Sequence, residues 1–360
     1  MSVKFYALKV EKIIKETPDC VSVQFEIPEN LKSEFVFKPG QYLTLRLPAS
    51  DEDIRRSYSI CSGKNENIIK VAVKKVDGGR FSTFANDSLK AGDILEVMPP
   101  MGNFTLNSDP ENKKNYVFFA AGSGITPIMS LIKSILTDEP ASSVTLFYGN
   151  RRFEDIIFRE ELEDLKNLYL NNLSIYYIFS KEKLGSPLFY GRIDGEKCGQ
   201  FSKALIDVKT SDEFMLCGPA EMIFSVKDKL IELGVNPKKI HFELFNTEGI
   251  KPNKKIATSE SKFNPDESSL VRIKLDDDFF DFSLNYGAEN ILDAALKNGA
   301  DLPFACKGGV CSTCKAKLIL GEVEMDMNYA LEPDELAAGF ILTCQSHPRS
   351  AEIFVDFDQK

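Results

Sequence analysis

The chain has 360 residues and a net charge of −10, with 43% hydrophobic and 27% charged residues. This length allows two or three domains, each with its own core, and the sequence contains no apolar run long enough to cross a membrane. The net negative charge is concentrated in Ser268–Lys360, where acidic side chains outnumber basic ones two to one. This argues against nucleic acid as a partner and suits docking to a basic protein surface, with solubility alone as the alternative explanation.

Only two histidines are present, His241 and His347. A histidine-rich zinc or non-haem iron centre therefore cannot be assembled from this chain. The first residues, MSVKFYALKV, lack the basic-then-apolar pattern of a secretory signal, so we expect a cytoplasmic protein.

Residues 1–107 are predicted to form an antiparallel Greek-key β-barrel. Short apolar strands alternate with turns marked by Pro39-Gly40 and Pro99-Pro100, and such close spacing is typical of barrels. The predicted strands are Val21–Ile27, Tyr42–Leu47, Ile68–Lys75 and Ile94–Met98.

Residues 112–245 alternate strand and helix, which indicates a parallel, doubly wound α/β sheet. The apolar strand Tyr116–Ala121 opens this domain, and a helix follows to about Leu136. The other predicted elements are strands Val144–Tyr148, Leu173–Phe179 and Glu213–Cys217, and helices Glu154–Leu168 and Ala220–Leu233.

Residues 246–267 are rich in Lys, Pro, Asn, Ser and Glu, as is typical of an exposed linker. Residues 268–360 then form a last domain, in which a short helix near Asn290–Asn298 is expected to stop at Gly299. Its predicted strands are Leu270–Leu275, Phe279–Ser283 and Ala351–Phe357.

The clearest motif is Cys306-x4-Cys311-x2-Cys314, followed much later by Cys344. In a cytosolic chain such a cluster binds metal more often than it forms disulfides. The spacing is that of plant-type [2Fe–2S] ligands, and the Gly308-Gly309 pair allows backbone N–H groups to approach the sulfurs. A structural zinc site is the alternative, although zinc motifs usually pair two C-x2-C units.

Arg56-Ser57-Tyr58-Ser59 stands at the end of a predicted barrel strand and offers the groups that a flavin needs. Tyr58 can cover the isoalloxazine ring, Arg56 can meet the pyrophosphate, and the Ser59 hydroxyl can lie near N5. Alone, this motif is also compatible with a surface Arg beside a core Tyr.

A second segment strengthens the flavin interpretation. Gly78 and Gly79 permit a tight turn, and Ser82 and Thr83 are expected to begin a helix. A helix start with hydroxyls and free N–H groups can bind phosphate.

Gly122-Ser123-Gly124-Ile125-Thr126-Pro127 follows an apolar strand and opens a helix. Such a turn brings backbone N–H groups to the pyrophosphate of a dinucleotide. Pro127 stands where the Rossmann fingerprint has its third glycine, which argues against a standard Rossmann domain.

The choice between NADPH and NADH depends on the ends of two strands. Asn150, Arg151 and Arg152 follow the strand Val144–Tyr148, where no carboxylate stands ready for a ribose 2′-hydroxyl. The arginines, with Ser180-Lys181, can instead meet a 2′-phosphate. We therefore favour NADPH, with ordinary surface charge as the alternative explanation of the arginines.

Together these motifs resemble the ferredoxin–NADP reductase superfamily, followed by a plant-type ferredoxin domain. The order of domains is that of oxygenase reductases, and RSYSICS, AGSGITP, LFYGNRR and CKGGVCSTCKAK are most similar to the reductase subunits of ring-1,2-phenylacetyl-CoA epoxidases. The resemblance implies a β-grasp fold for the last domain, FAD rather than FMN, and a di-iron oxygenase as partner.

The resemblance also assigns residues to each site. Ser59, Cys217 and Glu243 would lie at the reaction centre. FAD would be held by Arg56, Ser57, Tyr58, Ser59, Val73, Lys74, Gly78, Gly79, Ser82, Thr83 and Phe245. The nucleotide would be held by Gly122, Ser123, Gly124, Thr126, Pro127, Asn150, Arg151, Arg152, Ser180, Lys181, Cys217, Gly218 and Pro219, and the cluster by Cys306, Cys311, Cys314 and Cys344.

We therefore expect an enzyme that passes electrons from NAD(P)H through FAD to the cluster and on to an oxygenase. Flavin is needed because NAD(P)H gives two electrons as a hydride, whereas the cluster accepts one. The alternatives are a reductase for another oxygenase, a desaturase or a ferredoxin-like acceptor, and a non-enzymatic redox sensor. A sensor would need neither a flavin site nor a nucleotide site.

Overall fold

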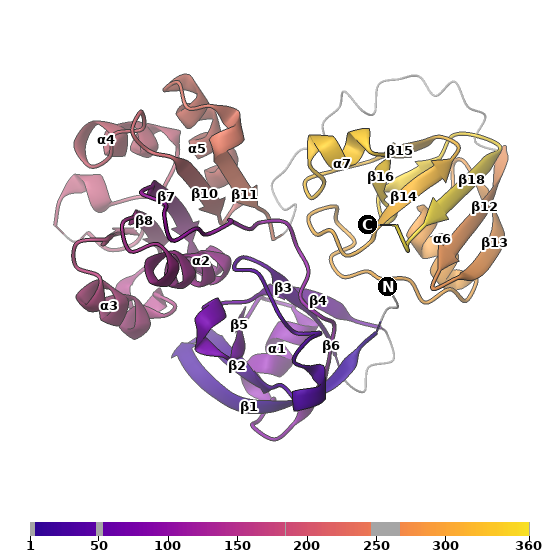
Figure 1. The fold of residues 1–360 in the computed structure, drawn as a ribbon, viewed down its shortest axis with the longest axis horizontal. Helices are drawn as coiled ribbons and strands as arrows, with labels where there is room; N and C mark the ends of the chain where they lie inside the picture. The colour runs from indigo at the N-terminus through magenta and orange to yellow at the C-terminus, as the bar shows by residue number, and fades with distance from the viewer. Residues whose placement is uncertain (1–3, 48–52, 184, 246–266, 360) are drawn as a thin grey trace. The chain divides into compact units, whose positions relative to one another are not determined.

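The structure is a computed structural model that describes residues 4–47, 53–183, 185–245 and 267–359, and its fold is drawn in Figure 1. The chain divides into two compact units, one covering most of residues 6–245 and the other centred on residues 267–359. The predicted linker, residues 246–267, falls outside the described residues except for its last one. In the described part of the chain, no helix is long and apolar enough to span a membrane.

The first unit opens with a six-stranded sheet in the order β4-β3-β6-β1-β2-β5, whose described pairings are antiparallel. Ile60, just after β4, pairs with Val71 of β5, so the two edge strands meet and the sheet closes into the predicted barrel. Val21, Val23 and Phe25 alternate into its core. The elements are β1 (Tyr6–Thr17), β2 (Cys20–Glu26), β3 (Tyr42–Arg46), β4 (Arg55–Ser59), β5 (Ile69–Lys74), α1 (Arg80–Asp87) and β6 (Ile94–Val97).

The second part of this unit is a five-stranded parallel sheet in the order β11-β10-β7-β8-β9. Figure 1 shows α2 and α3 on one face of the sheet and α4 and α5 on the other, as predicted for a doubly wound domain. The elements are β7 (Asn115–Ala121), α2 (Ile125–Asp138), β8 (Ser143–Asn150), α3 (Arg159–Leu168), β9 (Leu173–Phe179), α4 (Gly195–Ala204), β10 (Glu213–Cys217), α5 (Ala220–Glu232) and β11 (Ile240–Glu243).

Two predicted helix starts were wrong. The helix predicted from Glu154 begins at Arg159, because Phe158 has φ +61° and is buried with the two isoleucines before it, and a left-handed residue cannot continue a helix. The helix expected to begin at Ser82 begins two residues earlier, at Arg80. Strand β1, in which lysines and glutamates obscure the apolar alternation, and helix α4 were not predicted from the sequence.

The second unit has a mixed five-stranded sheet in the order β13-β12-β18-β14-β16, with β12 and β18 parallel. Helix α6 packs Ile291 and Leu292 into the core under this sheet, and Gly299, with φ +88°, follows the helix as predicted. The elements are β12 (Ser268–Leu275), β13 (Asp278–Asn285), α6 (Ile291–Lys297), β14 (Lys315–Leu320), β15 (Val323–Met325), α7 (Pro333–Ala337), β16 (Phe340–Leu342), β17 (Ser346–Pro348) and β18 (Glu352–Asp356).

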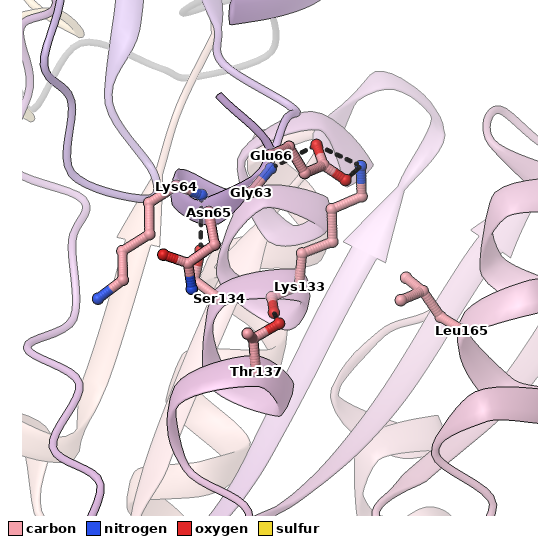
Figure 2. Close-up of a pocket in the computed structure, with 8 residues that line it drawn as sticks. All are labelled: Gly63, Lys64, Asn65, Glu66, Lys133, Ser134, Thr137 and Leu165. Atoms are coloured by element: carbon pink, nitrogen blue, oxygen red, sulfur yellow. Dashed lines mark hydrogen bonds and ion pairs between the residues drawn. The ribbon is translucent and has the colours of Figure 1, made fainter. Parts of the chain in front are cut away.

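In the first unit, the barrel packs against the nucleotide-binding half along α2. The turn after β4 approaches so closely that a Cβ on Gly63 would lie 3.0 Å from Cβ of Lys133, and the backbone N–H of Lys64 donates to Ser134 Oγ at 3.3 Å. A crevice of about 80 Å³ remains at this contact (Figure 2). Because a flavin or dinucleotide needs several times that volume, the crevice is a packing gap rather than a cofactor site.

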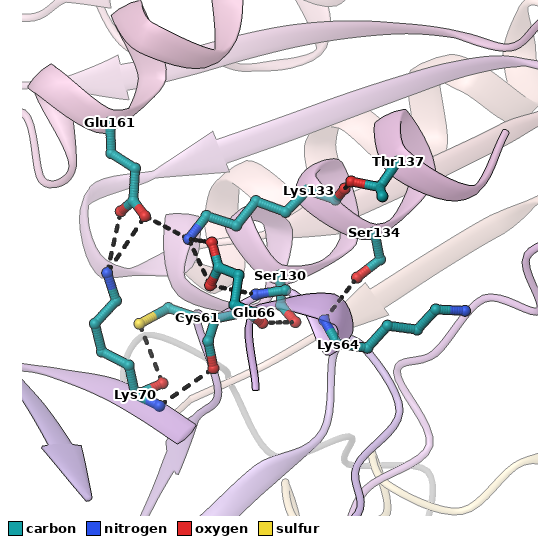
Figure 3. A network of polar contacts seen from close by, with 11 residues as sticks. Cys61, Lys64, Glu66, Lys70, Ser130, Lys133, Ser134, Thr137 and Glu161 are labelled. Carbon is teal, nitrogen blue, oxygen red and sulfur yellow. Dashed lines mark hydrogen bonds and ion pairs between the residues drawn. The ribbon is translucent and has the colours of Figure 1, made fainter. Parts of the chain in front are cut away.

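A cluster of four charged residues crosses the same contact, and we call it the interface charge cluster: Glu66 and Lys70 of the barrel with Lys133 and Glu161 of the other half (Figure 3). Lys133 forms ion pairs with Glu161 and, at 2.9 Å, with Glu66, while Lys70 lies 3.2 Å from Glu161. Both lysines are buried. Burial alone would raise the pKa of Glu161, but the two ammonium groups outweigh it and hold that pKa below its usual range.

Candidate functional site

The parallel sheet reverses its strand order between β7 and β10, and ligands of such sheets bind beyond the strand ends at that point. The loop after β7, Gly122–Pro127, meets the turn Cys217-Gly218-Pro219 after β10. A Cβ on Gly124 would lie 2.1 Å from the carbonyl oxygen of Cys217. Two predicted nucleotide-binding segments, far apart in sequence, are therefore packed directly against each other.

The sequence explains the shape of the loop after β7. Gly122 has φ +54°, its carbonyl accepts from the Tyr148 hydroxyl at 3.1 Å, and Thr126 Oγ1 donates to the Ser123 carbonyl at 3.0 Å. Pro127 is the third residue of α2, where a helix needs no backbone donor. The proline that departs from the Rossmann fingerprint therefore fits this position without cost.

The three predicted reaction-centre residues converge beside this loop. Cys217 at the end of β10 and Glu243 at the end of β11 are partners in register. Ser59, the last residue of barrel strand β4, donates from Oγ to Glu243 Oε2 at 3.1 Å. The flavin strand of the barrel thus reaches the nucleotide edge of the sheet through one hydrogen bond.

Burial determines the charge of these groups. Desolvation raises the pKa of Glu243 to about 8, against a smaller opposing effect of the Ser59 hydroxyl. Desolvation, with the nearby Glu243, also raises the pKa of the Cys217 thiol. Both shifts favour the protonated forms, a neutral carboxylic acid and a neutral thiol.

The other residues of the predicted flavin strand are less buried. Arg56 is exposed and donates to its neighbour's carbonyl at 2.8 Å, and Ser57 is partly exposed. The Tyr58 ring lies with its centroid 5.4 Å from that of Phe81 in α1. Phe81 is buried in the barrel core, and the partly buried Tyr58 packs against it.

The turn before α1 has the predicted glycine geometry. Gly78 has φ +68°, and a Cβ on Gly79 would lie 2.4 Å from Ser82 Oγ. The Ser82 hydroxyl accepts from the Val76 N–H at 3.1 Å and donates to the Gly79 carbonyl at 3.3 Å. It therefore closes the turn itself, whereas Thr83 is only partly buried.

Three further predicted flavin contacts occupy different surroundings. The Val73 side chain lies in the barrel core, so only its backbone can face a ligand. Lys74 lies 3.5 Å from Asp19 in an ion pair. Phe245 is 39% exposed at the end of the first unit.

The ends of β8 and β9 bring the predicted 2′-phosphate residues together. The N–H groups of Ser180 and Lys181 donate to the carbonyls of Asn150 and Arg151 at 3.0 and 2.9 Å. Asn150 is only 8% exposed, and neither polar atom of its side chain has a hydrogen-bond partner in the described structure. A buried amide of this kind fits a ligand that supplies both a donor and an acceptor.

The two arginines at this edge differ. Arg152 NH1 lies 3.0 Å from Glu154, so a carboxylate already compensates its charge. Arg151 and Lys181 are exposed. Of the two predicted arginines, Arg151 is therefore the better candidate for an anionic ligand.

The four cysteines of the second unit approach one another as two pairs. Cys311 Sγ lies 3.1 Å from Cys306 Sγ, and a hydrogen bond links Cys314 with Cys344. The hydrogen bond from the Cys311 thiol, followed by the backbone N–H groups of Gly308 and its neighbours, lowers the pKa of Cys306, whereas the pKa of Cys311 is raised. The loop therefore stabilises a thiolate, the form that binds iron.

This pairing fits a two-iron cluster better than a single zinc ion. Each iron of a [2Fe–2S] cluster takes two of four cysteines, whereas one zinc ion needs all four around one point. Lys307, with φ +50°, and Gly309, with φ +71°, turn the loop tightly enough to aim backbone N–H groups inward.

Sequence reasoning missed the interface charge cluster and Gln345, which adjoins the fourth cysteine. The signal for the first was Lys133 within the apolar run IMSLIKSIL. A lysine in the middle of a buried helix requires a partner. Gln345 carried no such signal, because its partner Lys307 lies in the cysteine loop, which is distant in the sequence.

Family models match three parts of the chain. Residues 7–106 match the oxidoreductase FAD-binding domain, residues 118–228 the oxidoreductase NAD-binding domain and residues 277–349 the 2Fe-2S iron-sulfur cluster binding domain. The chain is 44% identical over 356 residues to one of the subunits of 1,2-phenylacetyl-CoA epoxidase from Escherichia coli (strain K12), covering 99% of this chain and 98% of that protein.

Other similar proteins share the arrangement. The ferredoxin reductase component of 3-ketosteroid-9-alpha-monooxygenase from Rhodococcus rhodochrous is 31% identical, over 97% of this chain and 96% of that one. Phthalate dioxygenase reductase matches with a TM-score of 0.57 at 24% identity over 98% of both chains. A type IV self-sufficient cytochrome P450 monooxygenase matches with a TM-score of 0.70 at 18% identity, over 98% of this chain and 41% of that one. The two structures support the fold.

Proposed function

The chain belongs to the family of oxygenase reductases that includes this component of 1,2-phenylacetyl-CoA epoxidase, and on this basis we propose that it carries electrons from NADPH through FAD and a [2Fe–2S] cluster to an oxygenase component. The observation that carries the proposal is the Ser59–Glu243 hydrogen bond of 3.1 Å. It joins the flavin strand to the nucleotide edge, so that the two cofactors would meet at one place.

When bound, FAD would accept a hydride from the nicotinamide and release electrons singly to the cluster. The chain's own residues bind the cofactors and orient them. Tyr58 would cover the flavin ring. Arg56 and the N-terminus of α1 would lie near the phosphates of FAD. The loop Gly122–Pro127 would hold the nucleotide pyrophosphate, and the turn Cys217-Gly218-Pro219 would lie beside the nicotinamide. Gly218 allows this turn to pack closely on Ala121 and Met222. Glu243 would hold its proton next to Ser59.

We propose NADPH rather than NADH as the donor. Arg151 and Lys181 would bind the 2′-phosphate by charge-assisted hydrogen bonds, and the unpartnered Asn150 amide would bind the ribose. Replacement of Arg151 by Ala should lower kcat/KM for NADPH about tenfold and leave that for NADH nearly unchanged. An equal loss with both nucleotides would remove Arg151 from this role.

The second unit supplies the exit for electrons in this proposal. Cys306, Cys311, Cys314 and Cys344 would ligate the cluster, in a domain at residues 268–360 that follows a flavin domain at 1–107, a nucleotide domain at 112–245 and a linker at 246–267. The acidic surface of this last domain suits a basic docking face. We propose a cytoplasmic di-iron oxygenase that acts on a phenylacetyl-CoA thioester as the partner.

A single substitution tests the order of the carriers. Cys311→Ser should abolish NADPH-dependent reduction of cytochrome c, which needs the cluster, and spare reduction of ferricyanide, which needs only the flavin. Cys198→Ser in α4 is the matched control, because Cys198 is also a buried cysteine but lies far from the cysteine loop in the sequence. If both activities survived Cys311→Ser equally, the proposed electron order would be wrong.

The partner is tested by reconstitution. With NADPH present, the purified di-iron oxygenase and phenylacetyl-CoA should together accelerate NADPH oxidation and yield the oxygenated thioester. Acceleration by a Rieske oxygenase instead would favour the other reductases of this family, such as those of 3-ketosteroid 9α-hydroxylation. A wild-type protein whose flavin and cluster absorption did not bleach on addition of NADPH would favour a sensor.

A further inference from the structure

Gln345 follows the fourth cysteine and is 6% exposed. Its Nε2 carries two N–H groups and faces three acceptors: the carbonyl oxygens of Cys344 at 2.9 Å and Lys307 at 3.1 Å, and Sγ of Cys344 at 3.5 Å, so the sulfur shares an N–H with a carbonyl. One buried amide therefore contacts both parts of the cysteine site: the loop that carries the first three cysteines and the segment that carries the fourth.

The loop is shaped around this side chain. A Cβ on Gly309 would lie 3.2 Å from Cγ of Gln345 and 3.0 Å from the Met327 carbonyl oxygen, so any larger residue there would press on the amide. Lys307, whose carbonyl accepts from Gln345, has φ +50°, a conformation that non-glycine residues seldom adopt. The hydrogen bond from Gln345 helps to hold Lys307 in it.

We propose that Gln345 is a positioning residue that sets the reduction potential of the cluster, by donating an N–H to the sulfur of the ligand Cys344. This inference rests on the cluster ligands proposed above. Reduction adds negative charge that spreads onto the ligand sulfurs, and an N–H aimed at such a sulfur stabilises the reduced form more than the oxidised form. Burial strengthens the effect, because little water is present to screen it.

Both cysteine pairs accept hydrogen bonds from backbone N–H groups of the loop, and Cys344 accepts one from a side chain as well. Cys306 Sγ accepts from the backbone N–H of Gly308 at 3.3 Å, a group that every residue at that position except proline would supply. Cys344 accepts from the backbone N–H of Gly309 and, in addition, from the Gln345 side chain. Only the bond from Gln345 can be removed by a single side-chain substitution, so the potential is adjustable at position 345.

The experiment uses the full-length protein with FAD and cluster bound. Gln345→Met keeps the length of the side chain and removes its N–H groups, and Gln345→Glu keeps its shape and places an oxygen where the nitrogen was. Gln359→Met is the matched control, because Gln359 contacts Asp356 in the same domain. Iron content and the visible spectrum report cluster occupancy, and a spectroelectrochemical titration reports the midpoint potential.

Gln345→Met should retain the cluster and shift its equilibrium with the flavin about tenfold toward the oxidised cluster, which is about 59 mV for one electron. Gln345→Glu should shift it further in the same direction, and Gln359→Met should not shift it. The small change that D2O causes in the Fe–S stretching bands should weaken in Gln345→Met, as expected when an exchangeable N–H···S bond is lost.

An unchanged midpoint in either variant that retains its cluster would overturn the proposal. Loss of the cluster from both variants would also overturn it, because Gln345 would then serve assembly rather than potential. Reduction of ferricyanide by NADPH should be normal in every variant. A wild-type protein that lacked a cluster would instead contradict the proposed function.

Discussion

The nucleotide edge of the first unit and the cysteine loop of the second position their functional groups by different means. At the nucleotide edge, Ser59, Cys217 and Glu243 come from three strands, and the 3.1 Å bond between Ser59 and Glu243 spans 184 positions of sequence. In the cysteine loop, three of the four sulfurs lie within nine consecutive residues. The first site depends on how whole elements pack, and the second on a few backbone angles. Substitutions should therefore disrupt the first site by displacing whole elements, and the second by changing the local backbone.

The largest expected effect comes from Gly124, where the two loops of the nucleotide edge touch. In Gly124→Ala the new Cβ would stand 2.1 Å from the Cys217 carbonyl oxygen, so the loops must separate. Because a displacement of about 1 Å can cost about 100-fold in rate, kcat/KM for reduction of ferricyanide by NADPH should fall about 100-fold. The cluster, reduced with dithionite, should keep its paramagnetic resonance signal.

Gly199→Ala in α4 provides the control for this prediction. The Cβ it adds would have no neighbour closer than 3.8 Å, and alanine favours the helix. Its activity should equal that of the wild type. Activity within twofold of wild type in Gly124→Ala would mean that the contact between the loops does not position the nucleotide.

The same difference between the two sites explains which of their features could be predicted from the sequence. The cysteine spacing, the glycine turn with Pro127, and the parallel sheet were predictable because each depends on neighbours in the sequence. The Ser59–Glu243 bond was not, because it requires the barrel and the sheet to be placed relative to each other. Only the resemblance to known reductases assigned both residues to one reaction centre.

The errors have a similar origin. The charged sequence before α3 favours a helix from Glu154, but three apolar residues, Ile156, Ile157 and Phe158, are buried first. Tertiary burial therefore overrides local helix propensity at this point. The interface charge cluster escaped prediction because its partners, Glu66 and Glu161, lie in separate halves of the first unit.

A smaller effect is expected from breaking the interface charge cluster. Lys133→Met removes the cation between Glu66 and Glu161, and leaves Lys70 as the remaining partner of Glu161. Loss of one partner from a partly buried ion pair should lower the free energy of unfolding by about 2 kcal/mol. Urea unfolding followed by flavin fluorescence measures this loss, because flavin release reports on the first unit.

The exposed pair of Lys9 and Glu26, 2.8 Å apart in the barrel, supplies the matched substitution. Lys9→Met should leave the free energy of unfolding nearly unchanged, because exposed ion pairs are screened by solvent. Equal losses in the two variants would show that the interface charge cluster adds nothing beyond an ordinary surface pair. A double variant, Lys133→Met with Glu161→Met, should recover part of the loss, because Glu161 is then no longer a buried carboxylate short of a cation.

The last effect concerns the proton on Glu243, whose pKa desolvation raises to about 8. Between its ordinary pKa and this raised value, the folded protein binds a proton that the unfolded chain releases, so stability declines as pH rises through that window. Glu243→Gln keeps the neutral shape and has no proton to lose. The wild type should therefore lose several degrees more in melting temperature than Glu243→Gln between pH 5 and about pH 8, measured by calorimetry on the FAD-loaded protein. Infrared difference spectra should show a protonated carboxyl band at pH 7 that the variant lacks. Parallel melting curves without this band would mean that Glu243 is ionised, and that Ser59 donates to a carboxylate instead.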